Sequence, residues 1–319
     1  MKVGIALPAT ADAVGNSKNA VDLLIDQAGI AAAAGVSSLW FSQRFDIDAL
    51  TLVAAVAREV PEVELGTSVV PMYPRHPIVL ANQVQTVQAA SGGRFTLGLG
   101  LGAQPVAEGV YGVSYDRPIR HLRDYVAALR GIFAGEKIDI HGETLTASTT
   151  QLSTVVGGAA PVPIVVAAMG EQALRVTAEV ADGTLPYLAG PRTIAETIVP
   201  ALAASGRPSL RVVAAVPAVV TSNVDEVVAQ AEKELSFYDS IPSYQKVLAA
   251  ENLSRAAQLA LIGDEETVAA GVRAYFEAGA TEVLLAQTGL GSARDMTRTW
   301  ALAGALARES SHNAREGRA

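Results

Sequence analysis

The sequence contains no cysteine and only four histidines among its 319 residues. The absence of cysteine excludes disulfides, thiol catalysis and cysteine-ligated zinc. No two histidines stand at metal-ligand spacing on one helix face, so we expect no metal site. The four are His76, His121, His141 and His312.

Long apolar runs and positive charge are also scarce. No uninterrupted apolar stretch reaches the roughly 18 residues that a membrane helix needs, and the N-terminal apolar run is too short for a signal peptide. We therefore expect a cytoplasmic protein with no membrane partner. The formal net charge of −8 argues against nucleic acid as a partner, because general nucleic-acid binders carry a basic face.

Familiar catalytic constellations are missing as well. The sequence has no G-x-S-x-G nucleophile elbow, and no pair of carboxylates is placed convincingly for glycoside hydrolysis. A chain this poor in catalytic acids and bases suits a reaction whose difficult step belongs to a cofactor.

What the sequence does contain is an alternation of short β-rich runs and longer helical patterns. This alternation is typical of βα units and a parallel sheet. The apolar runs lack clean alternation, which favours a closed (β/α)8 TIM barrel over the rival, a doubly wound open sheet. The eight expected strands are at residues 3–7, 38–42, 64–70, 95–100, 163–167, 184–187, 210–220 and 282–286.

We expect one domain over residues 1–319, with two insertions. Residues 135–160 contain KIDIHGETLTA, which alternates around a glycine turn and predicts a β-hairpin. Residues 236–258 are expected to be partly helical. Elsewhere, Ser17 is a candidate N-cap for a helix that ends near Gly35, and the stretch QPVAEGVYG after the fourth strand is expected to form a loop.

Several polar residues have an ordinary structural interpretation. His76 stands before Pro77 and is a candidate cap for the helix that follows. Arg117, Arg120 and His121 are expected to form a solvated helix start or to bind a neighbouring aspartate, and His141 is expected at the surface of the hairpin.

In a parallel barrel the active site lies at the carboxyl ends of the strands, so the residues just after each strand are the candidates. The first such segment is residues 8–12. After the fifth strand, Ala168, Met169 and Gly170 open a helix, where small residues let a phosphate reach backbone N–H groups. An ordinary strand-to-helix turn is the alternative. The fourth-strand run LGLGLGA lacks the G-x-G-x-x-G spacing of a dinucleotide site, and its glycines are better explained by a flat ring that lies against the strand end.

Gln43 and Arg44 follow the second strand. One side chain could polarise a carbonyl and the other could bind an anion. A salt-bridged loop, with Arg44 bound to Asp46 or Asp48, is the alternative interpretation.

The stretch of residues 65–102, LGTSVVPMYPRHPIVLANQVQTVQAASGGRFTLGLGLG, resembles the third and fourth βα units of the luciferase-like family. This family includes bacterial luciferases, flavin monooxygenases and deazaflavin (coenzyme F420)-dependent oxidoreductases. Residues 163–191 and 261–286 resemble later units, so the resemblance runs through nearly the whole chain. The phrases LWFSQ, VPMYPRHP and ALIGDEETVAAG are most similar to the actinobacterial deazaflavin-dependent branch.

The resemblance implies an isoalloxazine-like ring across the barrel mouth. Ser68 and Val69 fall where the family often has a non-prolyl cis peptide that buttresses the ring, and Gln43 falls at a position that reaches it. A later segment matches the one that holds the cofactor phosphate. The cofactor-binding residues implied are Gln43, Ser68, Val69, Gly102, Ala168, Met169, Gly170 and Gln172.

The chain also departs from part of the family. Sugar-phosphate dehydrogenases of the family carry Asp-His where this chain has Gln43-Arg44, and a Glu where it has Ala103, followed by Gln104. The usual proton donor and base for alcohol oxidation are thus missing. We take Gln43, Arg44 and Gln104 as the candidate catalytic residues.

The resemblance implies transfer of a hydride between C5 of coenzyme F420 and a small organic substrate. The departures favour reduction of an electron-poor alkene, imine or nitroaromatic. An FMN-dependent monooxygenase on the same barrel is the alternative, and a non-catalytic flavin-binding relative is a second. Members of the family are often dimers, so a homodimer is expected by analogy.

Overall fold

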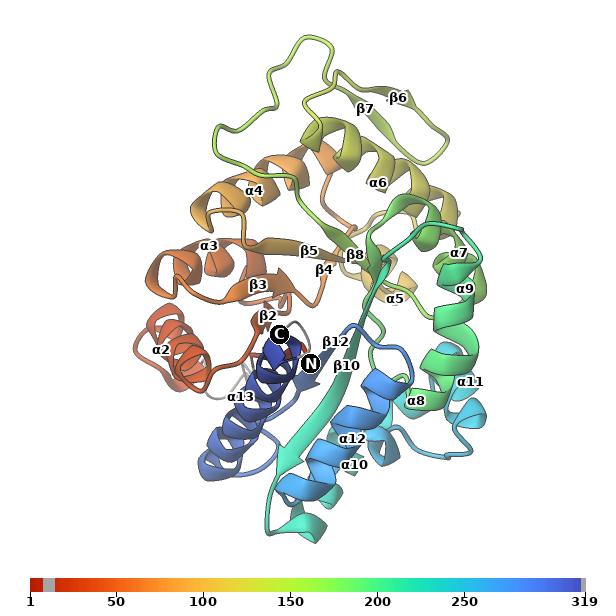
Figure 1. The fold of residues 1–319 in the computed structure, drawn as a ribbon. Coiled ribbons are helices and arrows are strands. Elements are labelled where there is room, and N and C mark those ends of the chain that lie inside the picture. The colour runs from red at the N-terminus through yellow and green to blue at the C-terminus, as the bar shows by residue number, and fades with distance from the viewer. Residues whose placement is uncertain (8–14, 317–319) are drawn as a thin grey trace. The chain divides into compact units, whose positions relative to one another are not determined.

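The computed structural model describes residues 1–7 and 15–316 (Figure 1). The segment 8–12, a candidate part of the site, lies outside these residues. The contacts within the chain divide it into two compact units. Unit 1 comprises Met1–Trp40, Leu185–Ala201 and Arg211–Ala319, and unit 2 comprises Phe41–Thr184 and Leu202–Leu210. That the whole chain forms one domain stays a prediction.

Unit 1 is built on a parallel sheet, and its outermost strand was not predicted from the sequence. Its strands lie in the order β11 (Leu261–Gly263), β10 (Arg211–Val220), β12 (Glu282–Ala286), β1 (Val3–Ala6) and β2 (Ser38–Phe41). The sequence did not predict β11, because three residues before an N-cap carry too short a pattern. Helices of this unit are α2 (Ala20–Ala33), α10 (Val224–Asp239), α11 (Pro242–Ala250), α12 (Glu265–Glu277) and α13 (Ala293–Glu316).

Unit 2 contains a second group of parallel strands. Their order is β3 (Glu64–Thr67), β5 (Phe95–Gly100), β8 (Ile164–Ala167) and β9 (Gly183–Thr184), and β4 (Val70–Pro71) also pairs with β5. The helices are α3 (Ala49–Glu59), α4 (Pro77–Ala90), α5 (Gln104–Gly109), α6 (Pro118–Phe133) and α7 (Glu171–Val180). Figure 1 shows α6 and α7 side by side.

The predicted β-hairpin is confirmed. β6 (Asp139–His141) and β7 (Thr146–Ser148) pair in antiparallel fashion. Residues 191–203 form a succession of α8 (Pro191–Thr193), the π-helix η1 (Ile194–Ile198) and α9 (Val199–Ala203). The second insertion contains α11 and a 3-10 turn, η2 (Ala256–Leu259), so it is partly helical as predicted.

Side-chain caps fix the beginnings of several helices. Asn19, rather than Ser17, caps α2, and its Oδ1 accepts hydrogen bonds from the backbone N–H groups of Val21 and Asp22. The prediction of Ser17 was wrong because the two polar residues are close in sequence and either can act as a cap. The prediction for His76 is confirmed, since its Nδ1 accepts from the N–H of Ile78.

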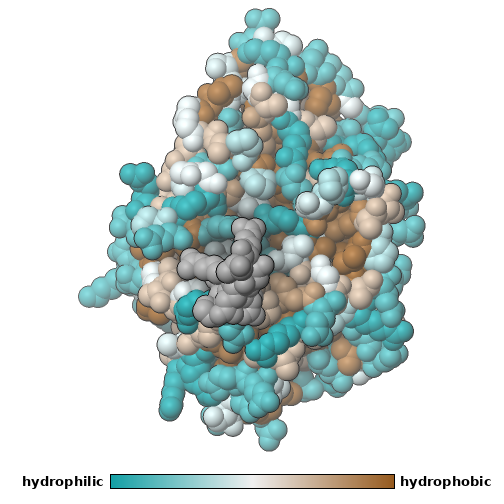
Figure 2. Space-filling model, viewed as in Figure 1, coloured by the Kyte–Doolittle hydropathy of each residue, from teal (hydrophilic) through white to brown (hydrophobic). Residues whose placement is uncertain are grey.

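The strands form the core of each unit. Every residue of β2, β5 and β12 is buried, which explains why these runs show no polar alternation. On the face of the molecule seen in Figure 2, hydrophilic residues predominate and hydrophobic residues form smaller areas between them. Within the described part of the chain, no helix is both long and apolar enough to span a membrane.

Candidate functional site

Three strands of unit 2 end at the same level. The register pairs Pro71 of β4 with Gly100 of β5, and Gly100 with Ala167 of β8. The residues that follow these strands are therefore neighbours in space, as expected for the carboxyl ends of parallel strands. They include most of the residues that the sequence marked as cofactor-binding.

The first wall of this site is the Ser68–Val69 peptide, which is cis as the resemblance predicted. A Cβ atom on Gly100 would lie 2.6 Å from Cγ2 of Val69, so the absence of a side chain on Gly100 gives Val69 its place. The hydroxyl of Ser42 donates to the carbonyl of Ser68 at 2.8 Å. The N–H of Gln43 lies 3.3 Å from the carbonyl oxygen of Val69, to which it donates. The end of β2 is thus tied to this wall.

The side chain of Gln43 is occupied by its own loop. Its Nε2 donates to the carbonyls of Arg44 and Ile47 at 2.7 and 3.2 Å. Its Oε1 accepts from the N–H of Ala49 at 3.2 Å and from the guanidinium of Arg75 at 3.0 Å. An amide bound in this way positions the backbone between β2 and α3.

Arg44 forms an ion pair with Asp46, which confirms the alternative interpretation of a salt-bridged loop. Two guanidinium nitrogens of Arg44 lie 2.8 Å from the two carboxylate oxygens of Asp46. This hydrogen bonding lowers the pKa of Asp46 to about 2. A second ion pair joins Arg75 to Asp48, which also caps α3 through Thr51.

The floor of the site is the end of β5. Gly102 has a φ of 76°, a region that favours glycine, and the nearest atom to a Cβ there would be that of Pro71 at 3.8 Å. The hydroxyl of Tyr115 donates to the carbonyl of Gly102 at 3.0 Å. Gln104 begins α5, is exposed and binds Glu108 at 3.1 Å. The loop predicted for this stretch was wrong, because Pro105 in the first turn starts a short helix.

The phosphate segment, residues 168–172, joins β8 to α7. Ala168 is buried, and the hydroxyl of Thr184 lies 2.9 Å from the carbonyls of both Val166 and Ala168. Gly170 is the N-cap of α7, and among the described residues no side chain caps this helix. A Cβ on Gly170 would meet nothing within 4 Å, and Gly170, Glu171 and Gln172 are exposed, so this end of α7 is open to solvent.

This arrangement fits a flat ring carrying an anion. Val69 and Gly102 offer an apolar wall and an open glycine surface, and the uncapped end of α7 offers N–H donors and a positive helix end. The exposed Gln172 lies in the same first turn. The residues present are therefore compatible with a flavin or deazaflavin phosphate.

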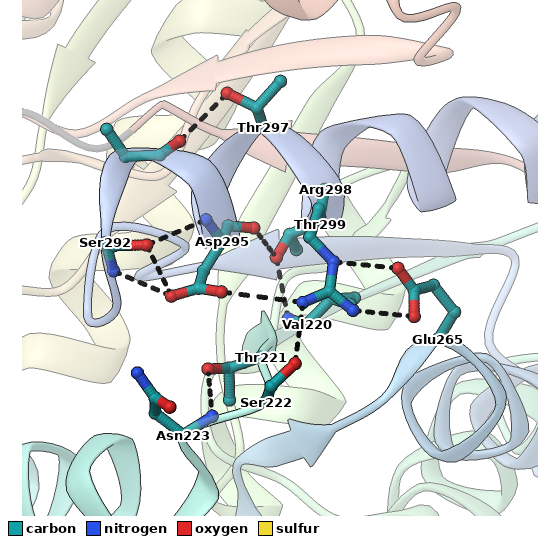
Figure 3. Close-up of polar contacts among 11 residues, drawn as sticks. Val220, Thr221, Ser222, Asn223, Glu265, Ser292, Asp295, Thr297, Arg298 and Thr299 are labelled. Atoms are coloured by element: carbon teal, nitrogen blue, oxygen red, sulfur yellow. Dashed lines mark hydrogen bonds and ion pairs between the residues drawn. The ribbon is translucent and has the colours of Figure 1, made fainter.

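Barrels often bind phosphate instead in the loops after their seventh and eighth strands, which here correspond to β10 and β12. Figure 3 shows the polar groups beside those strand ends bound to one another. Asp295 accepts from the hydroxyl of Ser292 at 2.7 Å, and Glu265 binds the guanidinium of Arg298 at 2.9 and 3.0 Å. In this network Arg298 is already paired with both Glu265 and Asp295.

An aromatic cluster in unit 2 was not predicted from the sequence. Tyr73 stacks on His121, with ring centroids 4.8 Å apart and planes 12° apart, and Tyr115 lies 5.3 Å from Tyr73. The Tyr73 hydroxyl is buried and has no hydrogen-bond partner among the described residues. Burial raises the pKa of Tyr73 to about 12, so the hydroxyl stays protonated.

The prediction that His121 is solvated was wrong, because its side chain is 8% exposed. Burial lowers its pKa below the usual 6.5. The period of α6 could have located it, since His121 is adjacent to Leu122 and four residues before Tyr125, both fully buried. His141 is exposed on the hairpin, as expected.

Comparisons with known proteins show the family and the fold. A family model described as luciferase-like monooxygenase matches residues 1–282. An uncharacterised protein of Mycobacterium tuberculosis is 33% identical over 230 residues, which are 67% of this chain and 67% of that protein. A 5,10-methylenetetrahydromethanopterin reductase of Methanolobus tindarius is 29% identical over 166 residues, 52% of this chain and 50% of the reductase.

Solved structures match nearly the full length. The coenzyme F420-dependent tetrahydromethanopterin reductase of Methanopyrus kandleri has a TM-score of 0.74 at 18% identity, over 95% of this chain and 96% of that one. The oxygenating constituent of 3,6-diketocamphane monooxygenase of Pseudomonas putida, in complex with FMN, has a TM-score of 0.72 at 16% identity, with the same coverage of 95% and 96%. These likenesses confirm the predicted (β/α)8 barrel. Because the family model covers most of its length, the chain belongs to the luciferase-like monooxygenase family.

Proposed function

We propose that this chain is an oxidoreductase that uses coenzyme F420 to transfer a hydride to or from a small organic substrate. One observation carries the proposal. The Val69 wall and the uncapped N-terminus of α7 come together at the ends of β4, β5 and β8. When bound, a deazaflavin supplies a hydride at its ring C5. The likeness to methanopterin reductases supports this cofactor for this chain.

In this proposal each group of residues has a separate task. Ser68, Val69 and Gly102 would contact the ring, and the N–H groups after Gly170 would bind the phosphate together with Gln172. Ala168 and Met169 would pack beneath the segment, where Ala168 is fully buried and Met169 half-buried. Exclusion of water by these side chains strengthens every electrostatic contact to the cofactor.

The side chains proposed for catalysis are largely committed to other partners. Gln43 binds its loop, Arg44 binds Asp46, and Gln104 binds Glu108. We therefore assign Gln43 a positioning role. The substrate proposed is an electron-poor alkene, imine or nitroaromatic, because such acceptors take a hydride without a strong acid or base beside the reacting carbon.

Direct titration tests the cofactor. The protein is mixed with oxidised coenzyme F420 and, separately, with FMN, and binding is followed by cofactor fluorescence. Micromolar binding of F420 with much weaker binding of FMN is expected. Preferential binding of FMN, with oxygen consumption when the flavin is reduced, would replace the proposal by the monooxygenase, whose fold the FMN-bound neighbour shares. Binding without any substrate-dependent turnover would point to a non-catalytic relative.

One substitution tests the phosphate segment without unfolding it. Gly170→Asp supplies the missing side-chain cap of α7, so stability should be kept or slightly raised. The added carboxylate would occupy the anion site and weaken binding of the phosphate-bearing cofactor by at least about tenfold. Gly170→Ala is the matched control, because its methyl group enters open space. The expected homodimer and the cytoplasmic location stay predictions.

A further inference from the structure

Three tyrosines of unit 1 form a second aromatic cluster. Tyr187 follows β9, Tyr238 lies near the end of α10 and Tyr244 lies in α11. The ring centroids of Tyr187 and Tyr238 are 5.4 Å apart and those of Tyr238 and Tyr244 are 4.9 Å apart, and both contacts are edge to face. Tyr238 and Tyr244 belong to the insertion over residues 236–258, to which the proposed function gives no role.

Backbone hydrogen bonds hold the segment around Tyr187 against the sheet. The carbonyl of Pro186 accepts from the N–H of Ala215 on β10 at 2.9 Å, and the N–H of Leu188 donates to the carbonyl of Ala215 at 3.1 Å. Leu188 has a φ of 53°, in the left-handed region that leucine seldom adopts. Such conformations persist where the surroundings impose them, and they cluster at binding sites. The backbone that carries the Tyr187 ring is therefore fixed.

The hydroxyls of these tyrosines lack partners. The Tyr187 hydroxyl is buried and has no hydrogen-bond partner in the protein. Within the part of the chain that the structure describes, no hydrogen bond engages the hydroxyls of Tyr238 and Tyr244 either. Burial raises the pKa of Tyr187, and the two neighbouring tyrosines raise it further, so its hydroxyl stays protonated. A ligand that brings an acceptor to this hydroxyl gains a hydrogen bond that the protein leaves unmade.

The charge near this hydroxyl favours a neutral ligand over an anion. Besides burial and the two neighbouring tyrosines, the carboxylate of Glu234 raises the pKa of Tyr187, so negative charge already acts on the hydroxyl. An anion there would be repelled by Glu234 and would lose its hydration on burial. A carbonyl or nitro oxygen accepts the hydrogen bond without bringing a net charge.

The cluster continues to the surface of unit 1. Phe237 contacts Tyr238 with ring centroids 5.7 Å apart and is 67% exposed. Tyr238 and Tyr244 are only half-buried, so their rings can turn outward while both helices stay folded. Such a turn opens a path from the surface to the Tyr187 hydroxyl. A further aromatic ring can pack edge to face against the rings that line this path.

We propose that Tyr187, Tyr238 and Tyr244, the tyrosine site, bind a neutral aromatic compound that carries a hydrogen-bond acceptor, such as an aryl ketone or a nitroaromatic. The ring of the ligand packs among the tyrosine rings, and the Tyr187 hydroxyl donates to the acceptor oxygen. All three tyrosines belong to unit 1, and binding there needs no cofactor. The insertion supplies two of the three rings, so it determines which compounds bind.

Three small probes separate the two features of the ligand. Acetophenone has the ring and the acceptor, ethylbenzene has the ring alone, and cyclohexyl methyl ketone has the acceptor without an aromatic ring. Dissociation constants are measured by ligand-observed NMR on the full chain without cofactor. Acetophenone should bind most tightly, about fivefold more tightly than ethylbenzene, as expected for one hydrogen bond.

Tyrosine substitutions test the role of the hydroxyl. Tyr187→Phe removes the hydroxyl and keeps the ring, and the fold should be kept because the hydroxyl has no partner in the protein. This variant should bind acetophenone about fivefold more weakly and ethylbenzene as well as the wild type does. Tyr73→Phe is the matched control, since it removes an equally buried and unpaired hydroxyl from unit 2. It should change neither constant, whereas Tyr244→Leu should weaken binding of both aromatic probes.

A fluorine label locates the bound probe. All eight tyrosines are replaced by fluorotyrosine, and single Tyr→Phe variants assign the fluorine NMR signals of Tyr73, Tyr187, Tyr238 and Tyr244. Acetophenone should shift the signals of the three residues of the tyrosine site and leave the signal of Tyr73 in place.

Several results would overturn the tyrosine site. They are equal affinity for the three probes, no binding of acetophenone, and acetophenone binding that Tyr187→Phe leaves unchanged. A shift of the Tyr73 signal alone would place the probe elsewhere and would also overturn it. Because no cofactor is present in these measurements, their result is independent of whether the proposed function holds.

Discussion

The side chain of Val69 occupies the space that a side chain on Gly100 would need: a Cβ there would lie 2.6 Å from Cγ2 of Val69. Gly100→Ala should therefore displace Val69 and destabilise the fold by about 1–3 kcal/mol, the usual cost of overpacking. Cofactor affinity should fall as well, because the ring wall moves. Urea unfolding and cofactor titration measure the two effects.

Gly109→Ala is the matched control for that substitution, because a Cβ on Gly109 would meet nothing within 4 Å. Its stability should equal or slightly exceed that of the wild type, since alanine favours helix more than glycine. If Gly100→Ala proved as harmless as Gly109→Ala, the contact with Val69 would not constrain the site.

The pair also illustrates what a sequence can and cannot tell. The glycines of the run at β5 were predicted to leave room for a flat ring against the strand end, and the strand itself was predicted correctly. Gly100 makes room for Val69 because β4 pairs with β5. This pairing could not be predicted, since the two residues of β4 carry no recognisable strand pattern. Periodicity predicts long elements well, and contacts between short ones arise only from tertiary packing.

The hydrogen-bond partners of side chains were the second feature that the sequence could not predict. Gln43 was placed correctly after β2, yet its amide is bound by Arg44, Ile47, Ala49 and Arg75. One of these partners lies 32 residues away in sequence, so no local pattern could identify it. His121 was missed for a different reason: a charged neighbourhood in sequence concealed its place on the buried face of α6.

The Tyr73 hydroxyl gives a direct test of the aromatic cluster. It is buried without a hydrogen-bond partner among the described residues, whereas the hydroxyl of Tyr125 donates to the carbonyl of Arg75 at 2.8 Å. Tyr73→Phe should leave stability unchanged or slightly raised, and Tyr125→Phe should cost about 1 kcal/mol. Chemical denaturation compares them. Equal losses would mean that an ordered water or other group satisfies Tyr73.

His121 should make stability depend on pH. Burial lowers its pKa below 6.5, the value expected in the unfolded chain. The unfolded state then binds more protons in acid, so the contribution of His121 is intact above pH 6.5 and is lost as the pH falls below it. The nearby carboxylate of Asp124 opposes this shift without reversing it. Unfolding free energies at neutral and mildly acidic pH measure the loss.

Replacing His121 with an aromatic residue that does not titrate tests whether His121 causes the loss of stability in acid. His121→Phe keeps an aromatic ring against Tyr73 and should show a smaller loss of stability on acidification than the wild type. His141→Gln, which changes an exposed histidine, should behave like the wild type. An acid-dependent loss of the same size in His121→Phe would assign it to other groups.

Glu282 joins the amino ends of three strands of unit 1. Its buried carboxylate accepts hydrogen bonds from the hydroxyl of Ser38 at 2.5 Å and from the guanidinium of Arg211 at 2.8 Å, and lies 3.1 Å from Nζ of Lys2. Glu282→Gln keeps the shape but leaves both cations without their counter-charge. The expected cost is about 3 kcal/mol, the lower end for breaking a buried ion pair, because water still reaches Lys2 and Arg211.

An exposed carboxylate of the same unit serves as the control for the loss of stability expected in Glu282→Gln. Glu265 binds Arg298 with about half of its side chain exposed, 51%, so Glu265→Gln should cost much less stability than Glu282→Gln and lose its effect in high salt. The Glu282 variant should stay destabilised at high salt, because buried charges are screened little. Cofactor affinity should be unchanged in both, since neither residue belongs to the site built from unit 2. Equal costs for the two variants, or a loss at Glu282 that salt abolishes, would show that water solvates the Glu282 carboxylate.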